Sequence, residues 1–143
     1  MANVEANRPE NYPNRELMNL AGETTITYVK YALPKLHQMV LEGRGKRVVG
    51  GVEARPEDDM IEIDLYGEEV IREIIDNERL PLQVYSEHAD PFIGPTDNVK
   101  MLAALDPFDN SSEYKGDLPT PVCSCISFYD LNRIPLAGAT AEL

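Results

Sequence analysis

The chain has 143 residues, and 43% of them are hydrophobic, which is enough for one compact domain with an apolar core. Acidic residues outnumber basic ones by 25 to 13, so the net charge is −12. An acidic protein repels nucleic acids and anionic membranes, and we exclude both as partners. The same charge attracts divalent cations.

The N-terminal stretch, MANVEANRPENYPNRE, is polar and lacks the basic start and apolar core of a signal peptide. No apolar run approaches the ~20 residues that a membrane-spanning helix needs. We therefore expect residues 1–14 to form a flexible arm and the protein to be cytoplasmic. Cys123 and Cys125 are two residues apart, so in a strand they would share one face and rarely bridge. We expect reduced thiols, with too few ligands nearby for a cysteine metal site.

Apolar residues recur at helical spacing from residue 15 to residue 42 and predict a long helix. They are Leu17, Leu20, Ala21, Tyr28, Val29, Ala32, Leu33, Leu36, Val40 and Leu41. Pro34 lies inside this stretch and is expected to kink or split the helix. GRGKR, residues 43–47, ends the helix with glycines and basic residues, as the helix dipole favours. A phosphate-binding basic patch is the alternative for GRGKR.

The next predicted elements are a short strand and a turn in VVGGVEARPEDD, residues 48–59. Met60, Ile61 and Ile63 alternate as at the end of a strand, and a helix is predicted over residues 65–77. Further strands are predicted over residues 82–85 and within VKMLAALDPFD, with the turn-rich loop PFIGPTDN between them.

A β-hairpin is predicted at the end of the chain, from TPVCSCISFYD through the turn LNR to IPLAGATAEL. The last strand runs to Leu143, the final residue. Because an edge strand leaves backbone groups unpaired, we expect a missing half or a partner chain beside it. A plain edge strand is the alternative.

Acidic residues lie at or just past the ends of three predicted strands: Asp64, then Glu87, then the pair Asp106 and Asp109. Strand ends of open sheets meet in a crevice where ligands bind. Carboxylate oxygens suit Mg²⁺ or Mn²⁺ better than zinc or copper. A helix beginning near residues 110–112 would add backbone N–H groups for an anion. The pattern predicts metal-assisted phosphoester hydrolysis.

Each acidic position also has a purely structural alternative. DPFD followed by polar residues commonly forms an Asx turn or a helix cap. Asp64 alone is typical of a helix N-cap, and Glu87 alone of a solvated loop. The prediction depends on the order, spacing and context of these residues together.

Residues 106–114, DPFDNSSEY, resemble the motif DP-[ILF]-D-G-[ST]-x-N of the lithium-sensitive, magnesium-dependent phosphatases, which include inositol monophosphatases and fructose-1,6-bisphosphatases. The double serine is closer to the fructose-bisphosphatase form, DPLDGSSN. Ser86-Glu87-His88 is similar to the end of a family strand that reads GEE or SEE. Asp64 and Glu68 are similar to a family Asp that opens a helix and is followed by a Glu four residues later. The resemblance covers about residues 15–143.

The resemblance implies an α+β fold: the layered α/β/α half of the sugar-phosphatase fold, with long N-terminal helices packed on a mainly antiparallel sheet. Residues 15–143 would form this domain, and the C-terminal half of the fold would be absent from this chain. The implied cofactor is Mg²⁺, with Mn²⁺ as the alternative. Glu87, Asp106 and the carbonyl of Phe108 would hold one ion, and Asp106 and Asp109 would share a second.

The resemblance also implies roles toward the substrate. Asp64, Ser111 and Glu87 would be catalytic. Asp64 would orient a water, or bind a third metal ion through a water, and the hydroxyl of Ser111 would position the attacking water. The N–H groups of Asn110 and Ser111 would hold the substrate phosphate. The implied activity is hydrolysis of a sugar or inositol phosphomonoester, completed by a second polypeptide or a second copy of this chain.

Three departures from the family pattern favour another reading. Asn110 replaces a glycine, His88 replaces a glutamate, and no acid after Asp109 matches the family's further metal-binding Asp. The structural alternative for His88 is an ordinary loop histidine. The alternative function is a non-catalytic, phosphatase-like subunit that binds a partner through its open sheet edge. A small acidic domain without such a site is the third hypothesis.

Overall fold

The computed structural model describes the chain except residues 1–13, 53–54 and 90, so the arm predicted for residues 1–14 lies, apart from Asn14, outside the described residues. The first helix, α1, spans Arg15–Leu41, and the Asn14 side chain caps it by accepting a 2.8 Å hydrogen bond from the N–H of Glu16. Of the two outcomes predicted for Pro34, a split is wrong, because α1 runs unbroken through this residue, and a kink stays a prediction. Pro34 and Lys30 are both exposed, so water can bond the Lys30 carbonyl that proline leaves without a donor.

Two strands follow α1 where one strand and a turn were predicted. They are β1 (Val48–Val52) and β2 (Arg55–Ile61), and they pair antiparallel. The second helix, α2, spans Glu62–Glu78, so it begins three residues before the predicted start at residue 65. Ile63 therefore lies in the first turn of a helix and not at the end of a strand. Arg79, with φ of 52°, ends α2 in the left-handed conformation.

A second, four-stranded sheet has the order β3-β4-β5-β6. Its strands are β3 (Leu82–Ser86), β4 (Met101–Asp109), β5 (Cys123–Asp130) and β6 (Pro135–Glu142), and the short helix α3 (Ser111–Lys115) follows β4. β3 is parallel to β4, whereas β4-β5 and β5-β6 are antiparallel. The predicted hairpin at the end of the chain is confirmed, and β6 lies at the edge of the sheet among the described residues.

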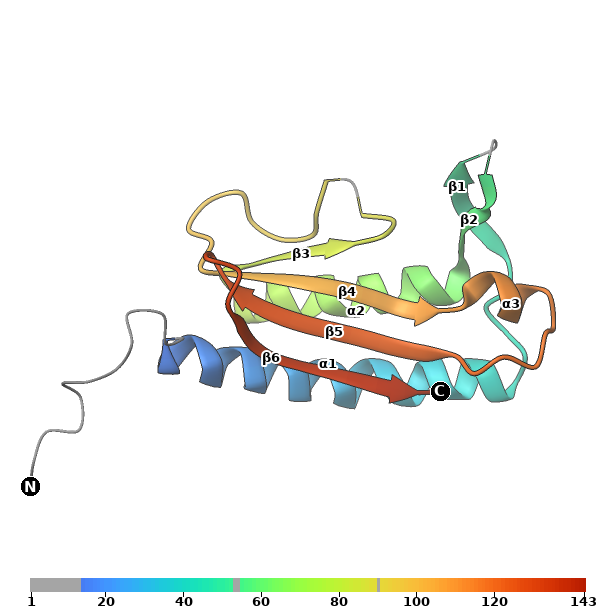
Figure 1. Cartoon of the computed structure of the whole chain (residues 1–143), viewed down its shortest axis with the longest axis horizontal. Helices are drawn as coiled ribbons and strands as arrows, with labels where there is room; N and C mark the ends of the chain where they lie inside the picture. Colours follow the sequence, from blue (N-terminus) through green and yellow to red (C-terminus); the bar gives the residue numbers. More distant parts are fainter. Residues whose placement is uncertain (1–13, 53–54, 90) are drawn as a thin grey trace, which may run out of the picture.

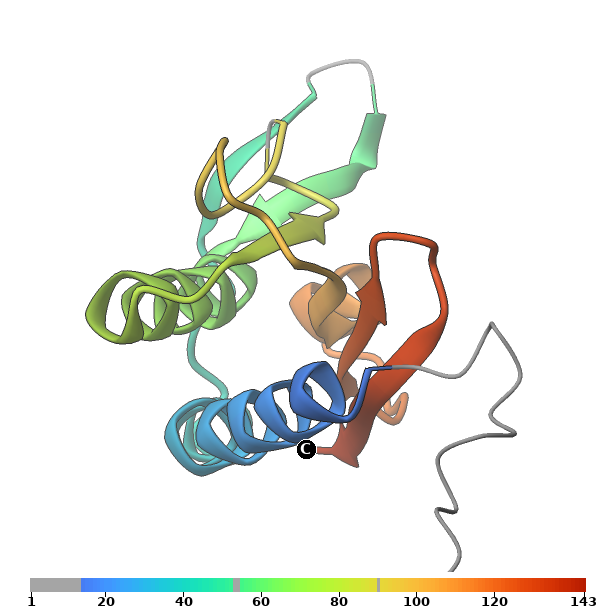
Figure 2. The same ribbon diagram turned by 90° about the vertical axis from the view of Figure 1, so that its left-hand side faces the viewer.

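Both long helices lie side by side on one face of this sheet, α2 against β4 and α1 against β6, as Figures 1 and 2 show. The core lies between the helices and the sheet. It includes Leu36 of α1, Ile71 of α2, Met101 of β4 and Phe128 of β5, all with 0% exposed surface. The predicted α+β class, with long helices on a mainly antiparallel sheet, is confirmed.

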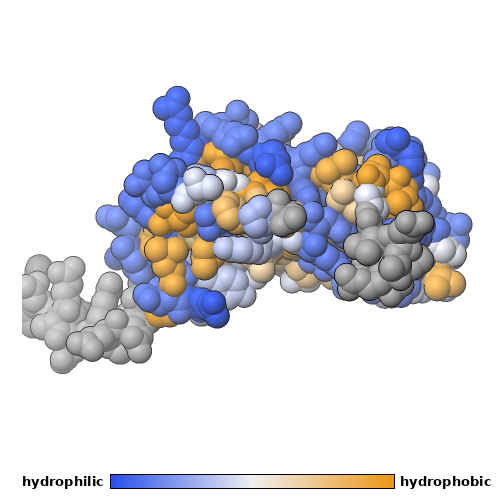
Figure 3. All heavy atoms as spheres, turned by 90° about the horizontal axis from the view of Figure 1, so that it is seen from above, coloured by the Kyte–Doolittle hydropathy of each residue, from blue (hydrophilic) through white to orange (hydrophobic). Residues whose placement is uncertain are grey.

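The surface seen in Figure 3 is mainly hydrophilic, with apolar side chains showing in separate patches. This agrees with the net charge of −12. Among the described residues, no helix has the length and hydropathy to cross a bilayer.

Candidate active site

The acidic residues singled out in the sequence come together at one end of the molecule. β3 and β4 are parallel, so their carboxyl ends lie at the same edge of the sheet. Figure 1 shows that the first turns of α2 and the short helix α3 lie at this end too. The site is therefore built from one helix start and two strand ends.

Asp64 and Glu68 occupy the first two turns of α2 and face inward, with 3% and 6% of their surface exposed. Oδ2 of Asp64 accepts a 2.8 Å hydrogen bond from the N–H of Ile61, so Asp64 caps the helix from within its first turn. The Ser86 hydroxyl at the end of β3 donates to Oε1 of Glu68 at 2.5 Å. The structural alternative for Asp64, the N-cap of α2, is wrong in position: Ile61 is the N-cap, and Asp64 lies at the third helical position and bonds back to the N-cap N–H. This bond does not take Asp64 away from the site.

The DPFD segment is irregular where it must present its carboxylates. Regular pairing of β4 with β5 stops at Asp106, opposite Cys125, and resumes at Asp109, opposite Cys123. Pro107 has no N–H to offer the ladder, which accounts for the interruption. Oδ1 of Asp106 accepts a 3.2 Å hydrogen bond from the N–H of Phe108, so the Asx turn is also confirmed.

The carboxylates of α2, β3 and β4 lie within electrostatic reach of one another. Burial, and to a lesser extent the charges of Asp106, Glu87 and Glu68, together raise the pKa of Asp64 to about 7, although the hydrogen bond from Ile61 lowers it. The pKa of Asp106 is raised as well, mostly by burial and to a lesser extent by the charges of Asp109 and Glu87. In the described part of the chain, no lysine, arginine or histidine forms an ion pair with these carboxylates.

This donor set suits a hard divalent cation in chemistry and in charge, because clustered carboxylates without a cation repel one another. The described residues do not, however, bring three His, Cys, Asp or Glu side chains into one group that could hold a metal ion. Glu87 and Asp109 are exposed, whereas Asp64 is buried and Asp106 is half-buried. The metal-ligand roles of Glu87, Asp106, Phe108 and Asp109 therefore stay predictions.

Asn110, at the position of the motif glycine, has φ of 67° and ψ of 34°, and it precedes α3 as its N-cap. Asparagine adopts this left-handed conformation more readily than most residues. Its Nδ2 donates to the carbonyl of Pro121 at 2.9 Å, which ties down the loop after α3. Ser111 opens α3 and is half-buried. Nothing in the structure tests the predicted phosphate contacts of Asn110 and Ser111.

One neighbour of the site was not predicted. Sγ of Cys123 lies 3.6 Å from Oδ2 of Asp109 and 3.8 Å from Sγ of Cys125, and both thiols are free. Burial, the Cys125 thiol and the charge of Asp109 raise the pKa of Cys123 to about 12, so this thiol stays protonated at neutral pH. Because the two cysteines are two residues apart, the sequence indicated that they share one face of a strand. The position of Cys123 beside Asp109 depends on the register of β4 against β5 and could not be predicted.

We expect the metal-free protein to lose stability as pH rises between about 4 and 7 because of Asp64. Its pKa in the folded state, about 7, exceeds the ordinary value of 3.8, so its stabilising effect is complete below 3.8 and is lost toward pH 7. Urea unfolding in EDTA at pH 4 to 8 measures this. Asp64→Asn should flatten the profile by roughly 2–4 kcal/mol across this range, whereas Asp76→Asn, at the exposed end of α2, should not. Parallel profiles for wild type and Asp64→Asn would contradict the expectation.

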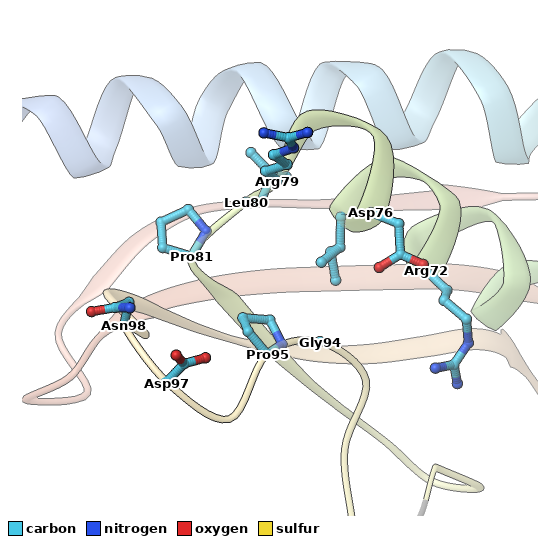
Figure 4. A pocket seen from close by; sticks show the side chains of 10 residues that line it. Arg72, Asp76, Arg79, Leu80, Pro81, Gly94, Pro95, Asp97 and Asn98 are labelled. Atoms are coloured by element: carbon cyan, nitrogen blue, oxygen red, sulfur yellow. The ribbon is translucent and has the colours of Figure 1, made fainter.

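A separate cavity of about 450 Å³ lies at the opposite end of α2 (Figure 4). The last turns of α2 contribute Arg72, Asp76 and Arg79, and the loop before β4 contributes Asp97. Its charged side chains carry both signs, and it is separated from Asp64 by the length of α2. It is not part of the acidic site.

No protein-family model matches the chain, and no curated protein matches its sequence. The fold, in contrast, has known counterparts. Fructose-1,6-bisphosphatase from Leishmania major matches with a TM-score of 0.60 and 18% identity, over 83% of this chain and 36% of that one. A putative sedoheptulose-1,7 bisphosphatase from Toxoplasma gondii matches with a TM-score of 0.55 and 19% identity, over 85% of this chain and 36% of that one.

The fold expected from the DPFD, SEH and Asp64-Glu68 motifs is thus confirmed: the chain has the fold of part of a sugar bisphosphatase. It spans about a third of the length of each of these two enzymes, 36% in both cases.

Proposed function

We propose that this chain is part of a Mg²⁺-dependent phosphatase that hydrolyses a phosphomonoester of a sugar or inositol phosphate. The observation that carries the proposal is the gathering of carboxylates from α2, β3 and β4 at one sheet end, where burial first, and then their mutual charges, raise the pKa of Asp64 and Asp106. The fold supports it, because the two matched structures are named as sugar bisphosphatases.

Four residues would hold the divalent cations. Glu87, Asp106 and the backbone carbonyl of Phe108 would bind one ion, and Asp106 and Asp109 would share the other. The irregular segment between Asp106 and Asp109 supports this, since it interrupts the ladder between the two carboxylates. When bound, such ions supply an activated water and stabilise negative charge on the phosphate.

The chain's own residues would position the water and the phosphate. Asp64 is buried in the first turn of α2, and its charge interacts with that of Asp106, so it would orient or bind through a water beside the ions. The hydroxyl of Ser111 would orient the attacking water. The backbone N–H groups of Asn110 and Ser111 would hold the substrate phosphate at the start of α3.

We propose further that a second polypeptide, or a second copy of this chain, completes the fold. The sheet face turned away from α1 and α2 carries a hollow of about 410 Å³ lined by Tyr85, Leu102, Ala104, Tyr129 and Arg133. Tyr85 has 47% of its surface exposed on this face. An additional layer covering the hollow would bury these side chains.

A non-catalytic subunit is the second candidate. It is favoured by the lack, among the described residues, of a group of three ligating side chains ready to hold an ion. His88 in place of a second glutamate favours it as well. In this case the acidic site would be a remnant, and the open sheet edge at β6 would bind the partner.

Phosphate release decides between the two. Protein purified natively, which keeps any partner attached, is assayed with fructose-1,6-bisphosphate and inositol-1-phosphate in Mg²⁺ and then in Mn²⁺. Metal-dependent release that lithium suppresses supports the phosphatase and identifies the substrate class. No release from either substrate, with a partner chain still bound, supports the non-catalytic subunit.

A further inference from the structure

A hollow of about 580 Å³ lies between the end of α1, the loop after it and the start of α2. Four of the chain's 13 lysines and arginines line it: Lys35, Arg44, Lys46 and Arg47. Two glutamates, Glu62 and Glu69, also line it. In a chain with a net charge of −12, a wall with more cations than anions is unusual. The hollow is distinct from the acidic site, which lies at the sheet ends.

The loop that carries three of these cations is held firmly at both ends. The N–H of Arg44 donates to the carbonyl of Met39 at 2.9 Å, and the N–H of Ile63 donates to the carbonyl of Gly45 at 3.1 Å. Gly45 is buried with φ of 82°, and an added Cβ would lie 2.7 Å from Cε of Met39. Only glycine fits there, so the loop is ordered before any ligand arrives.

Lys46 is held in place from the other side by residues near α3. Its Nζ lies 4.7 Å from the centroid of the Tyr114 ring, and it forms an ion pair with Asp117. The Tyr114 hydroxyl in turn lies 2.8 Å from the carbonyl of Arg44. The cationic loop is therefore supported by α1, α2 and α3 together.

The acids that now pair with these cations are exposed and exchangeable, including Asp117, the partner of Lys46, with 82% of its side chain exposed. Arg44 pairs with Glu42, and Arg47 pairs with Glu62 at 3.3 Å, where 73% of the arginine side chain and 45% of the glutamate side chain are exposed. Exposed pairs of this kind contribute little to stability. A phosphate dianion bonds two guanidinium groups through charge-assisted, bidentate contacts and competes well with such partners.

We infer that this hollow binds a small phosphorylated molecule, with the phosphate on Arg44, Lys46 and Arg47 and the organic part on Leu65 and Tyr66. A volume of about 580 Å³ suits a ligand of that size. The overall negative charge excludes nucleic acid as the source of the phosphate. This inference does not rest on the proposed phosphatase function.

The test is a titration of the native protein with inorganic phosphate in the presence of EDTA. Calorimetry measures the binding, and the unfolding midpoint measures the stabilisation that binding gives. EDTA removes divalent ions, so the acidic site repels the probe and a failure here is separate from a failure of the phosphatase proposal. Wild type should bind phosphate saturably. Arg44→Gln/Lys46→Gln should weaken binding by about tenfold or more. Arg47→Gln, which leaves the Lys46–Tyr114 contact intact, should weaken it as well.

The matched control is Lys30→Gln/Arg72→Gln, which removes the same charge from exposed positions outside the hollow and should bind as wild type does. Absence of saturable binding to wild type would overturn the inference, as would an equal loss in the control. Vesicles containing phosphoinositides provide a further arm. Their control is the soluble inositol phosphate headgroup. If the protein binds the vesicles more tightly than it binds this headgroup, the ligand is a lipid and the small-molecule assignment is overturned.

Discussion

Asp106→Asn should lower metal-dependent phosphate release by more than about 100-fold. Mutating a residue that only hydrogen-bonds to a metal ligand already lowers metal affinity or activity by about 10–100-fold, and Asp106 is proposed to be a ligand itself. It should also abolish the rise in unfolding midpoint that Mg²⁺ or Mn²⁺ gives wild type, a stabilisation of about 2.7 kcal/mol at 100 times the dissociation constant. Asparagine keeps the size of the side chain and can still accept the hydrogen bond from the N–H of Phe108. The loss would therefore reflect charge and not the turn.

The matched control for this variant is Asp76→Asn, which removes one exposed carboxylate from the far end of α2. It should retain both the activity and the metal-induced stabilisation. If Asp106→Asn keeps them too, Asp106 holds no catalytic ion. If both variants lose them, the effect is one of general charge.

Gly67→Ala should destabilise the fold by about 1–3 kcal/mol, although alanine is the better helix former. Gly67 lies in α2 against β4, and an added Cβ would lie 2.4 Å from Cβ of Pro107. The proline ring is rigid, so α2 and the segment between Asp106 and Asp109 would have to move apart. Urea unfolding measures the loss, and weaker metal binding should accompany it.

Gly22→Ala is the control for helix propensity. Gly22 lies inside α1, and an added Cβ would meet nothing within 4 Å. This variant should gain about 0.5–1 kcal/mol. Equal stability of the two alanine variants would mean that the contact of α2 with Pro107 is not tight, and that the acidic site is not held as described.

The sequence predicted most of the fold because its elements repeat apolar residues with clear periods. α1, β3, β4 and the β5–β6 hairpin lie where the pattern placed them. The strand β1 and the end of β2 at Met60 and Ile61 were predicted. The first part of β2 was read as a turn because VVGGVEARPEDD combines glycine, proline and acids, which are typical of turns. A split at Pro34, one of the two outcomes predicted there, does not occur. Pro34 and Lys30 are exposed, so water can bond the Lys30 carbonyl, and this exposure could not be read from the sequence alone.

The acidic site could be predicted only in part. The motifs predicted that Asp64, Glu87 and Asp106 come together, and the pKa of Asp64, raised first by its burial, is also raised by the charges of Asp106 and Glu87. Two contacts depend on tertiary register and lay beyond the sequence: the Ser86 hydroxyl on Glu68, and Cys123 beside Asp109. The tolerance of asparagine for positive φ explains how position 110 keeps the turn without glycine.

The central claim is that the carboxylates at the sheet end bind a divalent cation. The most direct measurement is a Mn²⁺ titration of the natively purified protein followed by electron paramagnetic resonance, which distinguishes free from bound Mn²⁺. The account predicts at least one bound ion that Mg²⁺ displaces and that Asp106→Asn loses, with Asp76→Asn unchanged. Mn²⁺ that stays free, or that binds Asp106→Asn as well as wild type, would contradict it.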